Sequence, residues 1–283
     1  MKLRGRIVKL VHTLLLLAFT GLVQAAESPR PLRLGIMPFN STLALIKTHQ
    51  PLVHYLEKTL GRPVVIYTSA DYFTFVNELL DEQFDIAIAG PHFGSMAQAR
   101  GAKLLFRYQA TLQPIIVVRA GSNITSQEQL RGKRIGLSSR LSISSIGGVK
   151  WLKDHGLQPN IDYQLIERAT HGAAIAGVAV GDLDAALTTH TPLKQMPTDI
   201  QTKIGQMPLN IHIPHLMTLT SASLGKPLTE AIRGALRRFP ETAEGKKFFA
   251  DTGYQGYEDI TPADIQALQP FVDLTVQMMR QGQ

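Results

Sequence analysis

The chain has 283 residues, carries a formal net charge of +7 and contains no cysteine, while hydrophobic residues make up 44% of it. This composition is typical of a globular protein that depends on its core, and it excludes stabilisation by disulfides. Lysine and arginine do not form blocks with interleaved aromatic residues, so no nucleic acid is expected as a partner.

The first 25 residues have the pattern of a secretory signal peptide. Four basic residues precede an apolar stretch at 10–23, which is short for a membrane span, and Val23-Gln24-Ala25 offers a cleavage site. Removing 1–25 leaves 25 Lys and Arg against 22 Asp and Glu, a net charge of +3. An uncleaved anchor is the alternative. Because cysteine is absent, a lipoprotein anchor is excluded, and we expect a free protein in a bacterial periplasm.

From residue 32 onward, short apolar strands alternate with helices. In the first part we expect strands at 32–37, 64–67, 84–89 and 103–108, and helices at 42–60, 71–80 and 93–99. This βαβαβ order predicts a parallel sheet with helices on both faces.

The α/β pattern then starts again. We expect strands at 114–119, 133–137, 163–168, 184–188 and 213–218, and helices at 126–130, around 149–152, and at 171–180, 226–238, 243–251 and 262–279. The repeat predicts an α/β fold of two doubly wound lobes with a central ligand cleft. One lobe comprises 26–111 plus 213–283 and the other comprises 112–212, with hinges near 110–113 and 207–213.

A serine-rich loop follows the strand at 133–137 and runs into a helix. Its sequence, RIGLSSRLSISSIGG over 134–148, holds five serines. A helix start has unpaired backbone N–H groups and partial positive charge, so it favours an anion. The alternative is that these serines are ordinary helix caps and turn residues.

Several other polar groups follow predicted strands. Ligands in open α/β sheets bind at the carboxyl ends of the strands, so these groups should face the cleft. In the first lobe they are Ser41, Tyr72 and the segment Gly90-Pro91-His92, and in the second they are the serine loop, His171 and the segment Thr188-Thr189-His190-Thr191.

The order and spacing of several motifs resemble one family over nearly the whole mature chain. These motifs include PLVHYLE at 51–57, FDIAIAGP at 84–91, the serine loop, GDLDAA at 181–186 and Ile213-Pro214. They resemble the phosphate, phosphite and phosphonate branch of ABC-importer periplasmic substrate-binding proteins, which have the two-lobed type II fold.

The resemblance implies that a turn at a helix start holds a phosphorus oxyanion. The matching stretch is Ser142-Ile143-Ser144-Ser145, with His171 and Tyr72 at the positions of the family's histidine and first tyrosine. The resemblance thus implies ligand binding by Ser142, Ser144, Ser145, His171 and Tyr72. The position of polar groups after strands adds Ser41, Gly90, Pro91 and His92 to the expected ligand-binding residues.

The chain departs from the family pattern at three positions. Ile143 replaces a threonine, Ala89 replaces a second tyrosine, and Leu216 lies where an acid usually reads a ligand amine. These departures argue against 2-aminoethylphosphonate and leave phosphate, phosphite, another alkylphosphonate or an unrelated anion open.

The resemblance implies a solute-binding protein that captures a small phosphorus oxyanion and docks on an inner-membrane ABC permease. We expect a monomer with no cofactor and no metal, and no catalysis, because nucleophile-elbow, zinc and Walker motifs are absent from the sequence. The alternatives are a ligand sensor that signals to a membrane kinase or cyclase, and a binder of a different small anion.

Overall fold

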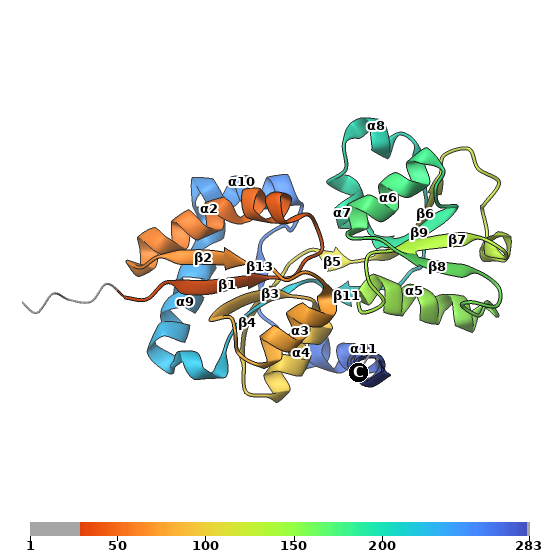
Figure 1. Cartoon of the computed structure of the whole chain (residues 1–283). Coiled ribbons are helices and arrows are strands. Elements are labelled where there is room, and N and C mark those ends of the chain that lie inside the picture. The colour runs from red at the N-terminus through yellow and green to blue at the C-terminus, as the bar shows by residue number, and fades with distance from the viewer. Residues whose placement is uncertain (1–28, 282–283) are drawn as a thin grey trace, which may run out of the picture. The chain divides into compact units, whose positions relative to one another are not determined.

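A computed structural model describes residues 29–281, so the predicted signal peptide lies outside the described residues. The chain folds around two larger sheets (Figure 1), and we call each sheet with its helices a lobe. In lobe 1 the strand order is β13 (Tyr257–Glu258), β4 (Lys103–Tyr108), β12 (Met217–Thr220), β3 (Ile86–Ala89), β1 (Leu32–Ile36) and β2 (Val64–Tyr67).

Lobe 2 contains the five-stranded sheet. Its order is β10 (Ile204–Pro208), β6 (Pro114–Arg119), β9 (Ala185–Thr189), β7 (Arg134–Leu137) and β8 (Gln164–Glu167). The two-lobed α/β fold expected from the sequence is therefore confirmed. The strands β10 and β13 were not expected.

Both sheets are mixed, so the parallel sheet expected for the first part of the chain is wrong for part of its pairing. The strands β2, β1 and β3 run parallel, as do β8, β7 and β9. The strand β12 pairs antiparallel with both β3 and β4, and β6 pairs antiparallel with both β9 and β10. In lobe 1 the reversed strand is β12, which follows the passage of the chain through lobe 2. In lobe 2 the reversed strand is β6, the first strand after the chain leaves lobe 1.

The helices of lobe 1 cover both faces of its sheet. The helices are α2 (Thr42–Leu60), α3 (Tyr72–Leu80), α4 (Pro91–Ala99), α9 (Lys226–Arg238) and α10 (Ala243–Thr252), with short 3₁₀ turns at Ala222–Leu224 and Phe239–Glu241. In Figure 1, α2 and α10 lie on one side of the sheet, and α3 and α4 lie on the other. Their starts follow capping chemistry, since Ser41 and Asp71 accept from Ala44 N and Thr74 N at 3.3 and 2.7 Å.

In lobe 2 the longest helix is the one that follows the serine loop. The helices are α5 (Ile143–Asp154), α6 (His171–Val180), α7 (His190–Lys194) and α8 (Thr198–Gln201), with a 3₁₀ turn at Gln127–Leu130. Gly148 lets α5 approach the sheet closely, because a Cβ there would be 2.4 Å from the Leu187 side chain. The start of α5 is thereby held at the edge of the sheet where β7 and β9 end.

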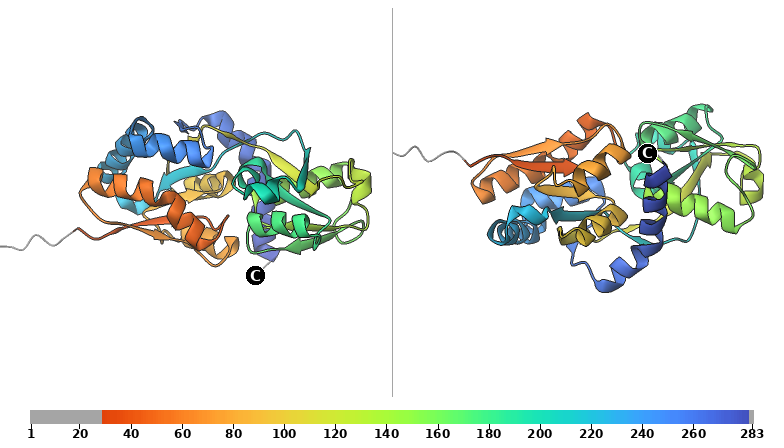
Figure 2. Two further views of the ribbon diagram at one scale, coloured as in Figure 1. Left: turned by 90° about the horizontal axis from the view of Figure 1, so that it is seen from above. Right: turned by 60° about the horizontal axis from the view of Figure 1, so that its bottom comes forward.

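Two chain crossings and one helix join the lobes. The crossings pair as the antiparallel strands β5 (Thr111–Leu112) and β11 (Ile213–Pro214), at the positions where hinges were expected. The C-terminal helix α11 (Pro262–Gln281) contacts α4 of lobe 1 and α5 of lobe 2. Figure 2 shows α11 running across the junction between the two sheets.

The largest buried hydrophobic cluster belongs to lobe 1. It is rich in aromatic side chains, and Tyr108 stacks on Tyr254 with ring centroids 4.1 Å apart. Lobe 2 has two smaller clusters, one on each face of its sheet. Among residues 29–281 no helix is both long and apolar enough to cross a membrane.

Candidate functional site

One buried pocket lies where the carboxyl ends of the parallel strands of both lobes meet, and we call it the interlobe pocket. The centre of a water-sized sphere can occupy about 40 Å³ of it, whereas a single water needs about 10–15 Å³. Its lining comprises Met37, Phe39, Tyr72, Gly90, His92, Leu112, Ser142, Ile143, Ser144, His171, Thr189, Thr191, Pro192, Gln195, His215, Leu216 and Tyr254.

The start of α5 provides a cluster of hydroxyl groups. Ser142 is the N-cap and its Oγ accepts from the backbone N–H of Ser145 at 3.2 Å. The same Oγ lies 3.0 Å from Ser144 Oγ and 2.8 Å from Ser145 Oγ. Because the first turn of a helix has no intrahelical acceptors for its N–H groups, this end of α5 has donors for an anion.

His171 is the first residue of α6, and its ring lies close to hydroxyl groups of both lobes. Its Nε2 lies 3.2 Å from Ser138 Oγ and 3.5 Å from the Tyr72 hydroxyl, and its Nδ1 lies 3.2 Å from Thr188 Oγ1. Burial lowers the pKa of His171 to about 4, so the ring is neutral at physiological pH. All of its close polar neighbours are hydroxyls, which can donate or accept.

Lobe 1 contributes mainly apolar and aromatic groups to the interlobe pocket. Met37 and Phe39 follow β1, Leu216 precedes β12, and Tyr254 follows α10. Tyr72 adds a hydroxyl at the start of α3, and burial raises the pKa of that phenol, which is therefore protonated. These side chains exclude water from the hydroxyl cluster, which strengthens polar interactions made there.

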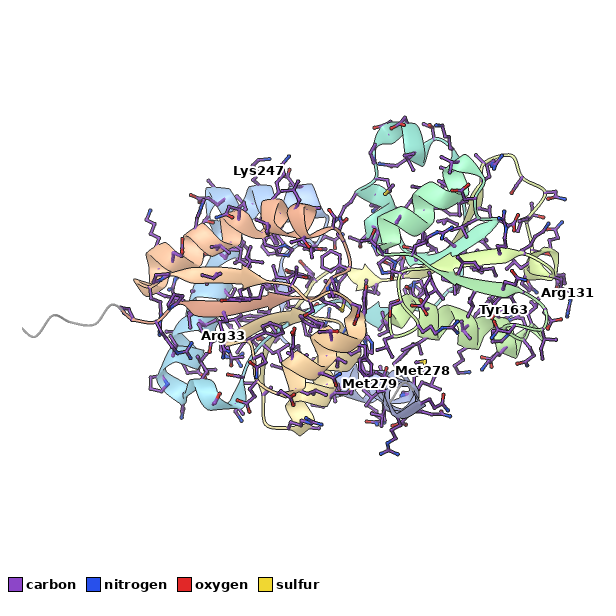
Figure 3. All side chains as sticks on the ribbon, in the orientation of Figure 1. Arg33, Arg131, Tyr163, Lys247, Met278 and Met279 are labelled. Carbon is purple, nitrogen blue, oxygen red and sulfur yellow. The ribbon has the colours of Figure 1, made fainter. Side chains whose placement is uncertain are left out.

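The pocket has no formally charged lining side chain. Among its lining residues, all within the described part of the chain, none is Asp, Glu, Lys or Arg. Burial lowers the pKa of His92 to about 4 and that of His215 to about 3, so these rings are neutral as well. The labelled Arg33, Arg131 and Lys247 lie away from the junction of the two sheets (Figure 3).

Six of the nine site residues predicted from the sequence line the pocket. These are Ser142, Ser144, His171, Tyr72, Gly90 and His92. Ser145 is buried behind Ser142, Pro91 is the first residue of α4, and Ser41 caps α2 at the exposed surface. Position directly after a strand could have indicated Met37 and Phe39, since both follow β1 as Ser41 does. No local pattern indicates Gln195 or Tyr254.

The three departures from the family pattern have different structural settings. Ile143 lines the pocket, and it also joins a buried cluster with Leu112 and Leu268 at the crossing between the lobes. Leu216 lines the pocket on the lobe 1 side. Ala89 is fully buried at the end of β3 and is not among the lining residues. Within residues 29–281 no group of three or more His, Cys, Asp or Glu is placed to hold a metal.

Two α/β lobes around a buried pocket are the architecture of two-lobed periplasmic binding proteins. The sequence model of the family described as "ABC transporter, phosphonate, periplasmic substrate-binding protein" matches residues 34–265. The chain therefore belongs to this family, whose members bind substrates for transport, and the resemblance noted in the sequence is confirmed.

Solved structures agree with this assignment at the level of the fold. PhnD1 from Prochlorococcus marinus (MIT 9301), solved with methylphosphonate, has a TM-score of 0.76 at 15% identity, covering 87% of this chain and 98% of its own. A binding protein of an ABC phosphonate transporter from Pseudomonas aeruginosa gives 0.75 at 16% identity, with coverages of 88% and 89%. A Xanthomonas citri protein bound to chloride gives 0.70 at 16%, covering 89% and 99%.

Proposed function

We propose that the interlobe pocket binds a small phosphorus oxyanion, which the protein delivers to a membrane ABC permease. The observation that carries this proposal is that the hydroxyl cluster at the start of α5 and the neutral ring of His171 line the same buried pocket. Oxyanion oxygens would accept from Ser142, Ser144, His171 and the N–H groups of the first turn of α5. Neutral donors in a dry site can hold an anion strongly, because little water competes with them.

The charge-free lining narrows the substituent on phosphorus. A cationic amine in this pocket would be a buried charge without a carboxylate partner. Moving such an unpaired charge out of water costs on the order of several kcal/mol of binding free energy. A hydrogen atom or a short alkyl group would instead pack against Met37, Phe39 or Leu216. We therefore propose phosphite or a short alkylphosphonate as the ligand, rather than 2-aminoethylphosphonate.

Calorimetry tests both the binding of an oxyanion and the restriction on its substituent. The ligands are phosphite, methylphosphonate, phosphate, sulfate and 2-aminoethylphosphonate. We expect the first two to bind most tightly and the amine-bearing ligand to bind at least about tenfold more weakly. If none of the five binds, the proposed function is wrong. If 2-aminoethylphosphonate binds best, only the restriction on the substituent is wrong.

Two variants test the location of the site. Ser144→Ala and His171→Ala should each weaken binding about tenfold or more, because each removes a polar group from the buried cradle. Ser126→Ala is the matched control, since Ser126 lies at the start of an exposed 3₁₀ turn in lobe 2. A ligand-induced rise in melting temperature that survives both pocket changes would place the anion elsewhere.

We also propose that residues 1–25 are removed on export and that the mature protein acts as a monomer. The cleavage pattern ending at Ala25 supports the first point. Mass spectrometry of protein purified from the periplasm should show a new N-terminus at Ala26, and light scattering should give the mass of a single chain. A full-length chain or a stable dimer would contradict these proposals.

A further inference from the structure

The serine loop makes a contact with lobe 1 that anion binding does not require. Leu141 belongs by sequence to lobe 2, between β7 and α5, yet its side chain is 7% exposed and joins the main hydrophobic cluster of lobe 1. That cluster also contains Tyr72 and Phe93. The tip of a lobe 2 loop is therefore inserted into the core of the other lobe.

A polar contact reinforces the same junction. The Leu141 carbonyl accepts from Nε2 of His92 at 2.9 Å, and His92 is fully buried near the start of α4. Because a carbonyl only accepts, His92 must carry its proton on Nε2. That proton is used between the lobes and is not available to a ligand, although His92 lines the pocket.

The loop also connects this junction to the proposed anion cradle. Ser138 contacts His171 at 3.2 Å, Ser139 Oγ accepts from the Leu141 N–H at 3.1 Å, and the next residue, Ser142, caps α5. The loop is thus tied to the cradle at both ends and to lobe 1 at its tip. A shift of the loop at one contact is therefore transmitted to the others over one or two residues.

We propose that Leu141 and His92 are positioning residues that couple occupancy of the anion cradle to closure of the lobes, through docking of Leu141 into lobe 1. This inference rests on the proposed function for the identity of the ligand. The closed form is stabilised by burial of Leu141 and by its hydrogen bond to His92, and a ligand that orders the loop favours that form further.

The first test measures closure without ligand. The doubly substituted protein Leu43→Cys, Val180→Cys carries one spin label in each lobe, at positions that are 76% and 66% exposed. Because the chain has no other cysteine, only these two positions are labelled. Double electron–electron resonance should show longer distances between the two spin labels in the Leu141→Ala and His92→Leu variants. His92→Gln, which can still donate to the Leu141 carbonyl, should shift the distances less.

The second test measures exchange of methylphosphonate by stopped flow. We expect Leu141→Ala to raise the dissociation rate about tenfold and to change the association rate little, because the cradle itself is retained. Ile124→Ala is the matched control, since Ile124 is also 7% exposed but packs in the core of lobe 2. This control should lower the melting temperature without changing distances or dissociation.

The outcomes separate the two proposals. If the unsubstituted protein binds none of the oxyanions, the proposed function fails, while the ligand-free distances still decide whether Leu141 and His92 hold the lobes together. If Leu141→Ala and His92→Leu leave both the distances and the dissociation rate unchanged, the coupling role is overturned. An equal change in the Ile124→Ala control would also overturn it.

Discussion

The two lobes contribute opposite chemistry to one pocket. Lobe 2 presents hydroxyls, a neutral histidine and the starts of two helices, as in Ser142, Ser144 and His171. Lobe 1 presents mainly apolar and aromatic side chains, as in Phe39 and Leu216, together with the neutral rings of His92 and His215. Under the proposed function, lobe 2 would select the ligand by hydrogen bonding, while lobe 1 would raise the affinity by excluding water and would limit the size of the substituent.

Acid should affect lobe 1 most, and this is the largest effect that we expect. His49, His92 and His215 lie in lobe 1 and His171 lies in lobe 2, and burial lowers each pKa to about 3 or 4. The unfolded chain binds these protons below about pH 6.5 and the folded chain does not, so stability is complete above pH 6.5 and falls toward pH 4. Each histidine contributes roughly 2 kcal/mol of loss between pH 6.5 and 5.

Denaturant unfolding at pH 7.5 and pH 5 measures this loss, and hydrogen exchange locates it. His49→Gln should reduce the pH dependence by about one proton, because His49 is fully buried. Leu43→Ala, at an exposed position on the same helix, removes no titratable group and provides the control. Equal loss of protection in both lobes would contradict the comparison between them.

A negative charge in the cradle should remove binding while the fold is kept. Ser144→Asp places a carboxylate in the first turn of α5, where the helix start favours it, so the chain should still fold. The same carboxylate repels an anion, and we expect affinity to fall at least about a hundredfold, or roughly 3 kcal/mol. Calorimetry measures the affinity. Thr198→Asp, at the exposed start of α8, is the control and should keep the affinity of the unsubstituted protein.

Loss of the α5 cap should have a smaller effect. Ser142→Ala should cost about 1 kcal/mol of stability and weaken the ligand about tenfold, because Ser142 both caps the helix and lines the pocket. Thr242→Ala removes a similar cap from α10, where Thr242 accepts from Gly245 N at 2.9 Å. That control should lose similar stability and keep full affinity, as measured by thermal shift and calorimetry.

The smallest change is expected in lobe 1. Tyr72→Phe removes a hydroxyl that lies 3.5 Å from His171 Nε2, a long contact, and it keeps the aromatic wall. Affinity measured by calorimetry should therefore fall less than about threefold. A loss as large as that in Ser144→Ala would mean that lobe 1 also selects the ligand by hydrogen bonding.

Sequence patterns predicted the helices better than the sheets. The bounds of α6 and α9 match the expectation because capping residues mark them locally, as Thr170 and Gly181 do for α6. Strand direction was missed for β12 and β6, since it depends on where the chain enters one lobe after leaving the other. The strand β10 was missed because Gly205 and Pro208 are unfavourable in strands.

In the candidate site, too, residues with a local sequence signature were predicted, and residues brought together by tertiary packing were mostly missed. Ser142, Ser144 and His171, which line the pocket, were predicted because helix starts after strands have a local signature. The apolar wall was mostly missed, since Phe39, Gln195 and Tyr254 come together only through the packing of distant segments. Ser41 has the same cap signature as Ser142, but its helix begins at the exposed surface.

The paired crossings β5 and β11 have a mechanical consequence. Leu112 pairs with Ile213 and Thr111 with Pro214, so the two linkers form one short ribbon. A hydrogen-bonded ribbon bends and twists more readily than its strands slide, because sliding breaks its hydrogen bonds together. Opening is therefore expected to be a rotation about a single axis, which leaves the opposite rim of the pocket as the entrance for solutes.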